Sequence, residues 1–187
     1  TELIEKYYQT NLIDGVTTNP TLIMKSGRNP EDVYQQLIDM GLDDVSMEVV
    51  GDFDAMYLEG IRLFRKFGKC ATIKVPCTQD GLRVCRELSR DLVNVNVTLI
   101  FSPAQAILAA KAGAKYVSPF VGRVDDNSFN GIDLVDQISD IYTIQNIRKT
   151  EILAASVRDV KTVSDAFGAG AHVVTMPPSI LEKMYNH

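Results

Sequence analysis

The feature that most constrains the fold is a regular alternation of two kinds of segment along the chain of 187 residues. Short segments rich in β-branched residues predict strands at 12–17, 45–50, 71–75, 93–101, 115–120, 151–155 and 171–175. Longer segments with the periodicity of amphipathic helices separate them, at 2–9, 30–40, 52–67, 79–90, 102–113, 131–146, 158–168 and after Pro178. Strands that alternate with helices indicate a parallel sheet with right-handed crossovers.

Seven strand–helix repeats favour an α/β fold of the (β/α)8 TIM-barrel class. Seven repeats are many for an open doubly wound sheet of this length, and they are one short of an eight-stranded barrel. Because the chain opens on a helix, we expect the first strand of the barrel to precede Thr1. Residues 1–187 are then a single barrel domain that lacks its N-terminal strand. A flavodoxin-like sheet is the alternative fold.

Composition excludes several classes of function. The net charge of −5 makes the chain a poor binder of nucleic acid, so an anionic ligand must be held by a few local cations. No apolar run is long enough to span a membrane, and the N-terminus does not resemble a signal peptide. An odd number of cysteines, at Cys70, Cys77 and Cys85, suggests reduced thiols and the cytoplasm. With two histidines and no Cys/His cluster, we expect no metal site.

Polar residues recur at alternate positions in three predicted strands, although parallel strands buried on both faces are usually apolar throughout. The polar positions are Ser46 and Glu48, then Thr72 and Lys74, then Asn94, Asn96 and Thr98. In the last of these strands the apolar positions are Val93, Val95, Val97 and Leu99. Because alternate side chains share a face, the apolar set should meet the outer helices and the polar set should line the barrel interior. If this alternation occurred in one strand alone, we would interpret that strand as amphipathic with one solvent-exposed face. Its occurrence in three strands favours a polar active-site lumen.

Lys74 is the most informative single residue, because it lies in an apolar strand and precedes Val75-Pro76. A lysine near a strand end is often a surface residue with a buried stem. Inside a barrel, however, burial disfavours the charged ammonium. A neutral amine can attack a carbonyl carbon and form a Schiff base without a metal. The residue type by itself leaves both interpretations open.

Five ordered segments, spread from about residue 12 to 178, carry a family resemblance. They are Gly15-Val16-Thr17-Thr18-Asn19-Pro20-Thr21, Ile73-Lys74-Val75-Pro76, Asn96-Val97-Thr98-Leu99-Ile100-Phe101-Ser102 with Ala104-Gln105-Ala106, Ser118-Pro119-Phe120-Val121-Gly122-Arg123, and Ala154-Ala155-Ser156-Val157-Arg158. In this order and spacing they resemble the transaldolase family, in its small single-barrel branch that includes fructose-6-phosphate aldolases. The resemblance implies a barrel of the class I aldolase kind.

The resemblance also implies a reaction and its residues. Lys74 would bind the carbonyl of a ketose phosphate, fructose 6-phosphate or sedoheptulose 7-phosphate, in the pentose phosphate pathway. A dihydroxyacetone unit would pass to an aldose phosphate without any outside cofactor. The implied catalytic residues are Lys74, Glu48 and Thr98, where Glu48 and Thr98 hold a proton-shuttling water. The implied substrate contacts are Asn19, Asn96, Phe120 and Ser156, and the implied phosphate site is Arg123, Ser156 and Arg158.

Each of these residues also has an ordinary structural interpretation. Glu48 could form an ion pair inside the lumen, for example with Lys74 itself, and this would not exclude the catalytic role. Asn19 and Asn96 could cap helices or bond to strand ends. Arg123 and Arg158 could form surface salt bridges, although guanidinium forks also suit phosphate oxygens.

Two positions separate the activities within the family. The resembling fructose-6-phosphate aldolases typically carry tyrosine where Phe120 stands and glutamine where Glu48 stands. A phenolic hydroxyl could exchange protons and aid release of free dihydroxyacetone, which Phe120 cannot do. The pair therefore favours transfer to an acceptor sugar, with fructose-6-phosphate aldolase activity as the alternative.

The chain also departs from the family pattern. The family's first strand carries an aspartate that contacts substrate, and no such strand precedes Thr1; its last helix extends past a motif like Met184-Tyr185-Asn186-His187. We therefore expect a chain trimmed at both ends. A non-catalytic barrel that binds sugar phosphates is a third hypothesis. Small members of the family often form rings, so we expect a homo-oligomer.

Overall fold

The computed structural model describes residues 2–186, and its centre is one sheet of parallel strands in sequence order. The strands are β1 (Val16–Thr17), β2 (Val45–Glu48), β3 (Ala71–Pro76), β4 (Asn94–Ile100), β5 (Tyr116–Pro119), β6 (Glu151–Ala154) and β7 (Val173–Val174). Each strand pairs in parallel with the next one along the chain, so every connection between neighbouring strands is a crossover. This α/β architecture of the barrel class was predicted from the alternation of segments.

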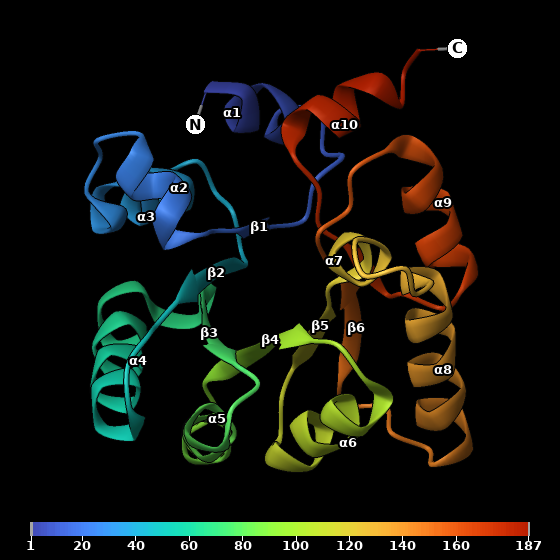
Figure 1. Cartoon of the computed structure of the whole chain (residues 1–187). Coiled ribbons are helices and arrows are strands. Elements are labelled where there is room, and N and C mark those ends of the chain that lie inside the picture. The colour runs from blue at the N-terminus through green and yellow to red at the C-terminus, as the bar shows by residue number, and fades with distance from the viewer. Residues whose placement is uncertain (1, 187) are drawn as a thin grey trace.

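The sheet curls, and its longer helices lie along the outer side of the curve (Figure 1). Its two edge strands, β1 and β7, lie close to each other. The hydroxyl oxygen of Thr17, in β1, is 2.7 Å from that of Thr175, which follows β7. Between these edges is a cavity of about 640 Å³, mostly lined by apolar side chains such as Ile13 and Leu153. The described sheet is therefore a seven-stranded half-barrel, which is consistent with a TIM-like barrel.

The helices begin and end at residues whose side chains suit those positions. They are α1 (Glu2–Tyr8), α2 (Pro20–Lys25), α3 (Pro30–Asp39), α4 (Phe53–Phe67), α5 (Gln79–Arg90), α6 (Pro103–Ala112), α7 (Val121–Asp125), α8 (Gly131–Ile144), α9 (Val160–Gly168) and α10 (Pro178–Lys183), with a 3₁₀ turn at Gly68–Cys70. Asn29 and Asp52 cap α3 and α4, as side-chain oxygens do for free backbone N–H groups. Ser102 and Gln105 form a capping box on α6, which ends at the left-handed Gly113.

The sequence prediction differs from the structure mainly in short elements. The strands predicted at 12–17 and 171–175 are reduced to two residues each, since ladder pairing at these edges is short. The helices α2 and α7, of six and five residues, were not predicted. Segments this short contain less than two turns, so they carry no measurable helical periodicity.

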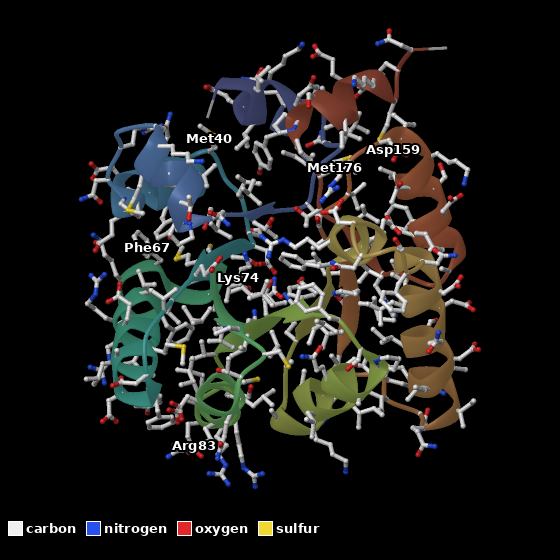
Figure 2. The ribbon with its side chains drawn as sticks, in the orientation of Figure 1. Met40, Phe67, Lys74, Arg83, Asp159 and Met176 are labelled. Carbon is white, nitrogen blue, oxygen red and sulfur yellow. The ribbon has the colours of Figure 1, made fainter. Side chains whose placement is uncertain are left out.

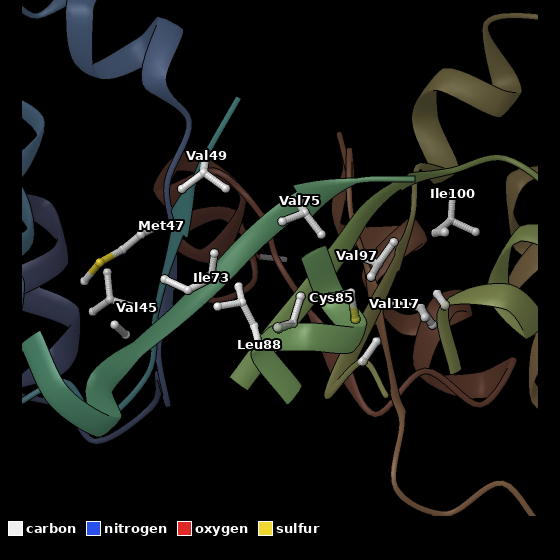
Figure 3. Packing of buried hydrophobic residues seen from close by; sticks show 14 of the residues in the cluster. Val45, Met47, Val49, Ile73, Val75, Cys85, Leu88, Val97, Ile100 and Val117 are labelled. Atoms are coloured by element: carbon white, nitrogen blue, oxygen red, sulfur yellow. The ribbon is translucent and has the colours of Figure 1, made fainter. Parts of the chain in front are cut away.

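The hydrophobic core lies between the outer face of the sheet and the helices. Figure 3 shows the apolar side chains of β2 to β5, among them Met47, Ile73 and Val97, with Leu88 of α5. Gly60 lets α4 pack closely against α5 and β3. A Cβ at this position would lie 3.1 Å from a methyl of Leu88 in α5 and 3.2 Å from a methyl of Ile73 in β3. The apolar half of the predicted alternation therefore does face the helices.

Leu99 is the exception, and its predicted place among the outward apolar positions was wrong. Its φ of 61° is left-handed, and the pairing of β4 with β5 shifts register between Val97 and Ile100. Such a bulge moves the following side chain to the other face. Ile100 is therefore the residue that enters the core, while Leu99 is half-buried.

None of the helices among residues 2–186 combines the length and the apolar character that a membrane crossing demands.

We predict that Leu88→Ala lowers the free energy of unfolding by about 2–5 kcal/mol, because it leaves a cavity under α4 and β3. Leu58→Ala, at a position of α4 that is 66% exposed, should change it by less than about 0.5 kcal/mol. Urea unfolding followed by circular dichroism measures both. Equal losses in the two variants would contradict the described core.

Candidate active site

The inner face of the half-barrel is polar in the three strands where the sequence predicted it. Glu48, Lys74 and Asn96 occupy paired positions on β2, β3 and β4, so their side chains share one face of the sheet. Lys74, Asn96 and Thr98 are buried, and Glu48 is half-buried. Charged and amide groups are seldom buried unless they are paired with one another. The lumen must therefore contain a connected set of polar contacts.

Lys74 makes the central contact of this set. Its Nζ donates to Glu48 Oε2 at 2.8 Å and to the backbone carbonyl of Thr18 at 3.3 Å. The residue is 8% exposed, and Figure 2 shows it among the strands near the centre of the molecule. The amine thus lies inside the curved sheet and not on the outer surface.

Asn96 is held on both sides of its amide. Ser118 donates a hydrogen bond to Asn96 Oδ1 at 2.7 Å, and Asn96 Nδ2 donates to Ser46 Oγ at 3.3 Å. The three residues come from β4, β5 and β2, and all are at most 2% exposed. This chain of hydrogen bonds fixes which end of the amide faces which strand, so Asn96 is a rigid group in the lumen wall.

Two buried hydroxyl groups of the lumen strands form no hydrogen bond with the described residues. Thr72 and Thr98 each have a side-chain oxygen with no hydrogen-bond partner among the described residues. An unsatisfied buried hydroxyl costs stability, and such groups in native proteins often serve function. Thr98 lies one step further along the same face than Asn96, toward the carboxyl end of β4.

A second ionic group lies at the amino ends of the strands. Asp44 accepts hydrogen bonds from Lys115 Nζ at 2.8 Å and from the Tyr116 hydroxyl at 2.9 Å. Burial raises the pKa of Tyr116, with the Asp44 charge adding to it and Lys115 opposing it. Burial acts to lower the pKa of Lys115, but the contacts with Asp44 and Tyr116 outweigh it and raise the pKa. These contacts join β5 to the start of β2 across the sheet.

An aromatic pair lies where β4 and β5 end. The rings of Phe101 and Phe120 meet edge to face with centroids 5.9 Å apart, and Phe101 is 45% exposed. The guanidinium of Arg123 lies over the Phe120 ring, 5.2 Å from its centroid. The guanidinium makes this cation–π contact and forms no salt bridge with a described residue, although its charge adds to the hydrogen bonds from Arg158 in lowering the pKa of Asp126.

Arg158 has a different environment from Arg123. Its Nη1 and Nη2 donate to the two carboxylate oxygens of Asp126, both at 2.5 Å. These hydrogen bonds lower the pKa of Asp126. Ser156, two residues earlier, has a left-handed φ of 61° and is half-buried. The surface salt bridge considered for Arg158 is thus present, whereas none is present for Arg123 among residues 2–186.

Asn19 lies just before α2, and its backbone carbonyl accepts from Ile23 N at 3.1 Å. Its side chain is on an exposed residue. This backbone hydrogen bond is the first of α2, so Asn19 lies at the start of that helix.

The structure brings some of the predicted site residues together directly. Lys74 and Glu48 form the ion pair that the sequence suggested, and Asn96 is the neighbour of Lys74 across the strands. Sequence reasoning named Ser46 as a polar lumen position, but it assigned no role to Thr18 and Ser118, the partners of Lys74 and Asn96, or to Asp44 and Tyr116, which bond to each other. For Ser46, the alternation of polar residues was the available signal. No local pattern indicates that Asp44 contacts Lys115, which is 71 positions away.

Residues 2–186 contain no cluster of three or more histidine, cysteine, aspartate or glutamate side chains arranged to hold a metal ion.

Comparison with known proteins identifies relatives along the whole chain. The family model for transaldolase/fructose-6-phosphate aldolase matches residues 1–187. A probable transaldolase of Nitrosopumilus maritimus is 50% identical over 187 residues, which is 100% of this chain and 84% of that protein. A probable transaldolase of Paracoccus denitrificans is 48% identical over 188 residues, covering 98% of this chain and 84% of that protein.

A third relative, a probable transaldolase of Caulobacter vibrioides, is 47% identical over 188 residues, with 100% of this chain and 86% of that protein covered. Identity at this level over almost the full chain matches the family resemblance seen in the five sequence segments. With a parallel half-barrel and a partly buried lysine–glutamate pair in its lumen, the chain belongs to the transaldolase/fructose-6-phosphate aldolase family.

Proposed function

We propose that this protein is a transaldolase that carries a dihydroxyacetone unit on Lys74 as a Schiff base. The donor is a ketose phosphate, fructose 6-phosphate or sedoheptulose 7-phosphate, and the acceptor is an aldose phosphate, as in the pentose phosphate pathway. The observation that carries the proposal is the position of Lys74. Its amine is buried among polar groups of the lumen and has a carboxylate oxygen at 2.8 Å.

Schiff-base chemistry needs a neutral amine and a nearby acceptor for its proton. The hydrogen bond between Lys74 Nζ and Glu48 provides this acceptor, and partial burial of the pair weakens the solvation of both charges. In the neutral form the amine attacks the ketose C2 carbonyl. The resulting carbinolamine takes back the proton held by Glu48 and loses one water, which gives the iminium ion.

Cleavage of the C3–C4 bond then requires removal of the proton on the C4 hydroxyl. Glu48 accepts this proton through a water molecule, while the electrons of the broken bond move into the iminium and form an enamine. The aldose phosphate leaves. We assign the same water to the Thr98 hydroxyl, since this buried group has no partner among the described residues and could donate to a water oxygen.

The remaining steps reverse this path with a second aldose phosphate. The enamine carbon attacks the acceptor aldehyde, and Glu48 returns the proton. Hydrolysis of the new iminium consumes one water and restores Lys74. Asn96, held by Ser46 and Ser118, is placed beside Lys74 to donate to substrate hydroxyls, and we propose Asn19 for the same role from the loop before α2.

The phosphate group is assigned to the rim formed by α7 and the segment after β6. Arg123, Ser156 and Arg158 lie there, and guanidinium groups bind phosphate oxygens in a geometry that lysine cannot match. The overall negative charge of the chain, −5, makes these local cations necessary for an anionic substrate.

Transfer is favoured over simple cleavage by the side chain at position 120. The Phe120 ring is packed between Phe101 and Arg123 and has no group that exchanges protons. Without such a group the enamine persists until an acceptor aldehyde arrives. Fructose-6-phosphate aldolase activity, with release of free dihydroxyacetone, is the alternative, and assays for the two products distinguish them.

We predict that borohydride added with fructose 6-phosphate fixes a three-carbon adduct on Lys74, located by mass spectrometry of peptides. Lys74→Ala should abolish both the adduct and turnover. Lys111→Ala, which removes an exposed lysine of α6, should leave both unchanged. An adduct on another lysine in the wild-type protein would refute the assignment.

Glu48→Gln should lower kcat for transfer by roughly 10²–10⁴-fold, the usual range for loss of a positioned acid–base group. The KM for fructose 6-phosphate should change much less. The control Glu59→Gln removes an exposed carboxylate paired with Arg62 and should retain wild-type rates. A purely structural role would instead give a lower thermal stability with an unchanged kcat.

Phe120→Tyr should raise the rate at which free dihydroxyacetone appears when no acceptor sugar is present, because the added hydroxyl can protonate the enamine. The measurement is a coupled assay for dihydroxyacetone beside one for transfer to erythrose 4-phosphate. If the wild-type protein already releases dihydroxyacetone as fast as it transfers it, the aldolase alternative is correct.

A further inference from the structure

The two arginines of the rim differ in what their guanidinium groups contact. Arg123 lies over the Phe120 ring and forms no salt bridge with a described residue, and its charge adds to the hydrogen bonds from Arg158 in lowering the pKa of Asp126. Both terminal nitrogens of Arg158 are occupied by Asp126, the residue that follows the last turn of α7. The rim therefore contains one guanidinium that is open to an anion and one that already holds a carboxylate.

The backbone of α7 fixes the stem of Arg158 in this arrangement. A Cβ at Gly122 would lie 2.8 Å from Arg158 Nε and 2.3 Å from the carbonyl oxygen of Ser156. The side chain therefore lies against the first turn of α7, in the space that this glycine leaves. Contact along the stem and the paired hydrogen bonds at its end together direct the guanidinium toward Asp126.

We propose that Asp126 is a specificity-determining residue, which occupies the guanidinium of Arg158 until the phosphate of the substrate displaces it. This inference rests on the proposed function for the nature of the ligand. The fork of Nη1 and Nη2 holds one bidentate partner at a time. A carboxylate carries one negative charge, whereas a phosphate monoester carries close to two at neutral pH.

The exchange is therefore selective by charge. A ligand with a single negative charge gains nothing over Asp126 and is also repelled by it, while a phosphate gains from its second charge and from Arg123 nearby. A built-in competitor is a recognised way to obtain specificity at some cost in affinity. Unphosphorylated sugars and monoanionic sugar acids are rejected because they leave the Arg158–Asp126 pair in place.

The position of the pair makes such an exchange feasible. The Arg158 and Asp126 side chains are 53% and 50% exposed, and exposed ion pairs are weak. A phosphate can thus displace Asp126 without a large penalty. The competition should weaken phosphate binding on the order of two- to fivefold, which is the usual strength of an exposed pair expressed as a ratio of dissociation constants.

The test is calorimetric titration of the full chain with inorganic phosphate at pH 7.5. Asp126→Asn should lower the Kd two- to fivefold relative to wild type, and the KM for fructose 6-phosphate should fall by the same factor without a change in kcat. Asp126→Ser, which removes the same charge with a different side chain, should shift the Kd in the same direction. The matched control is Glu87→Gln, which removes one carboxylate from the exposed Arg90–Glu87 pair of α5 and should change nothing.

A double-mutant cycle provides a readout that a merely structural role would not affect. Arg158→Ala should weaken phosphate binding only slightly when Asp126 is present. In the Asp126→Asn background the same substitution should weaken it more, because Arg158 is then free to bind the anion. A Kd that rises or stays unchanged in both Asp126 variants, or the absence of phosphate binding to the wild-type protein, overturns the proposal.

These results are separate from those that test the proposed function. Phosphate binding can follow the predicted order even if no adduct forms on Lys74, in which case the transaldolase assignment fails and the role of Asp126 stands. If an adduct forms on Lys74 while the Asp126 variants bind phosphate as the wild type does, the transaldolase assignment stands and the role of Asp126 fails.

Discussion

The arrangement of this protein depends on the ion pair between Lys74 and Glu48 within a sheet that is curled around its polar face. A parallel sheet covered by helices on one side directs half of its side chains outward into an apolar core. The polar side chains that point inward must then form hydrogen bonds and ion pairs with one another. Lys74 and Glu48 do so at 2.8 Å, on adjacent strands and at paired positions. Removal of either partner would leave a largely buried charge without compensation, which costs far more than the pair contributes.

The rest of the lumen extends the same principle along the strands. Asn96 is fixed by Ser46 and Ser118, and Asp44 is satisfied by Lys115 and Tyr116 near the amino ends. Interactions of this kind contribute rigidity and a single arrangement of groups more than they contribute stability. A catalytic amine benefits from rigid neighbours of this kind, because reacting atoms must be held within a fraction of an ångström of their productive positions. The hydroxyls of Thr72 and Thr98 have no hydrogen-bond partner among residues 2–186, so a substrate or a water could bond to them.

Near the carboxyl ends of β4 and β6 the backbone departs from regular strand geometry. Leu99 and Ser156 both adopt left-handed backbone conformations at the ends of β4 and β6, which non-glycine residues adopt at a cost. Phe101, which packs on Phe120, follows Leu99 after two residues, and Arg158 of the rim follows Ser156 after two residues. Bulges and left-handed residues re-aim the chain beside functional sites in many sheets. Here they turn the strands from the regular alternation of the lumen into the rim that we assign to the substrate phosphate.

Local sequence patterns were sufficient to predict the kinds and order of the main elements, because periodicity, helix caps and β-branched runs depend on residues only a few positions apart. They also indicated the polar inner face and singled out Lys74, a charge in an apolar strand. Which groups meet became visible only in the folded chain. The contacts of Lys74 with Glu48 and the Thr18 carbonyl, and that of Asp44 with Lys115, span 26, 56 and 71 positions. Such contacts are set by the curvature and register of the whole sheet, as are the shift at Leu99 and the pairing of Arg158 with Asp126, and no local pattern encodes them.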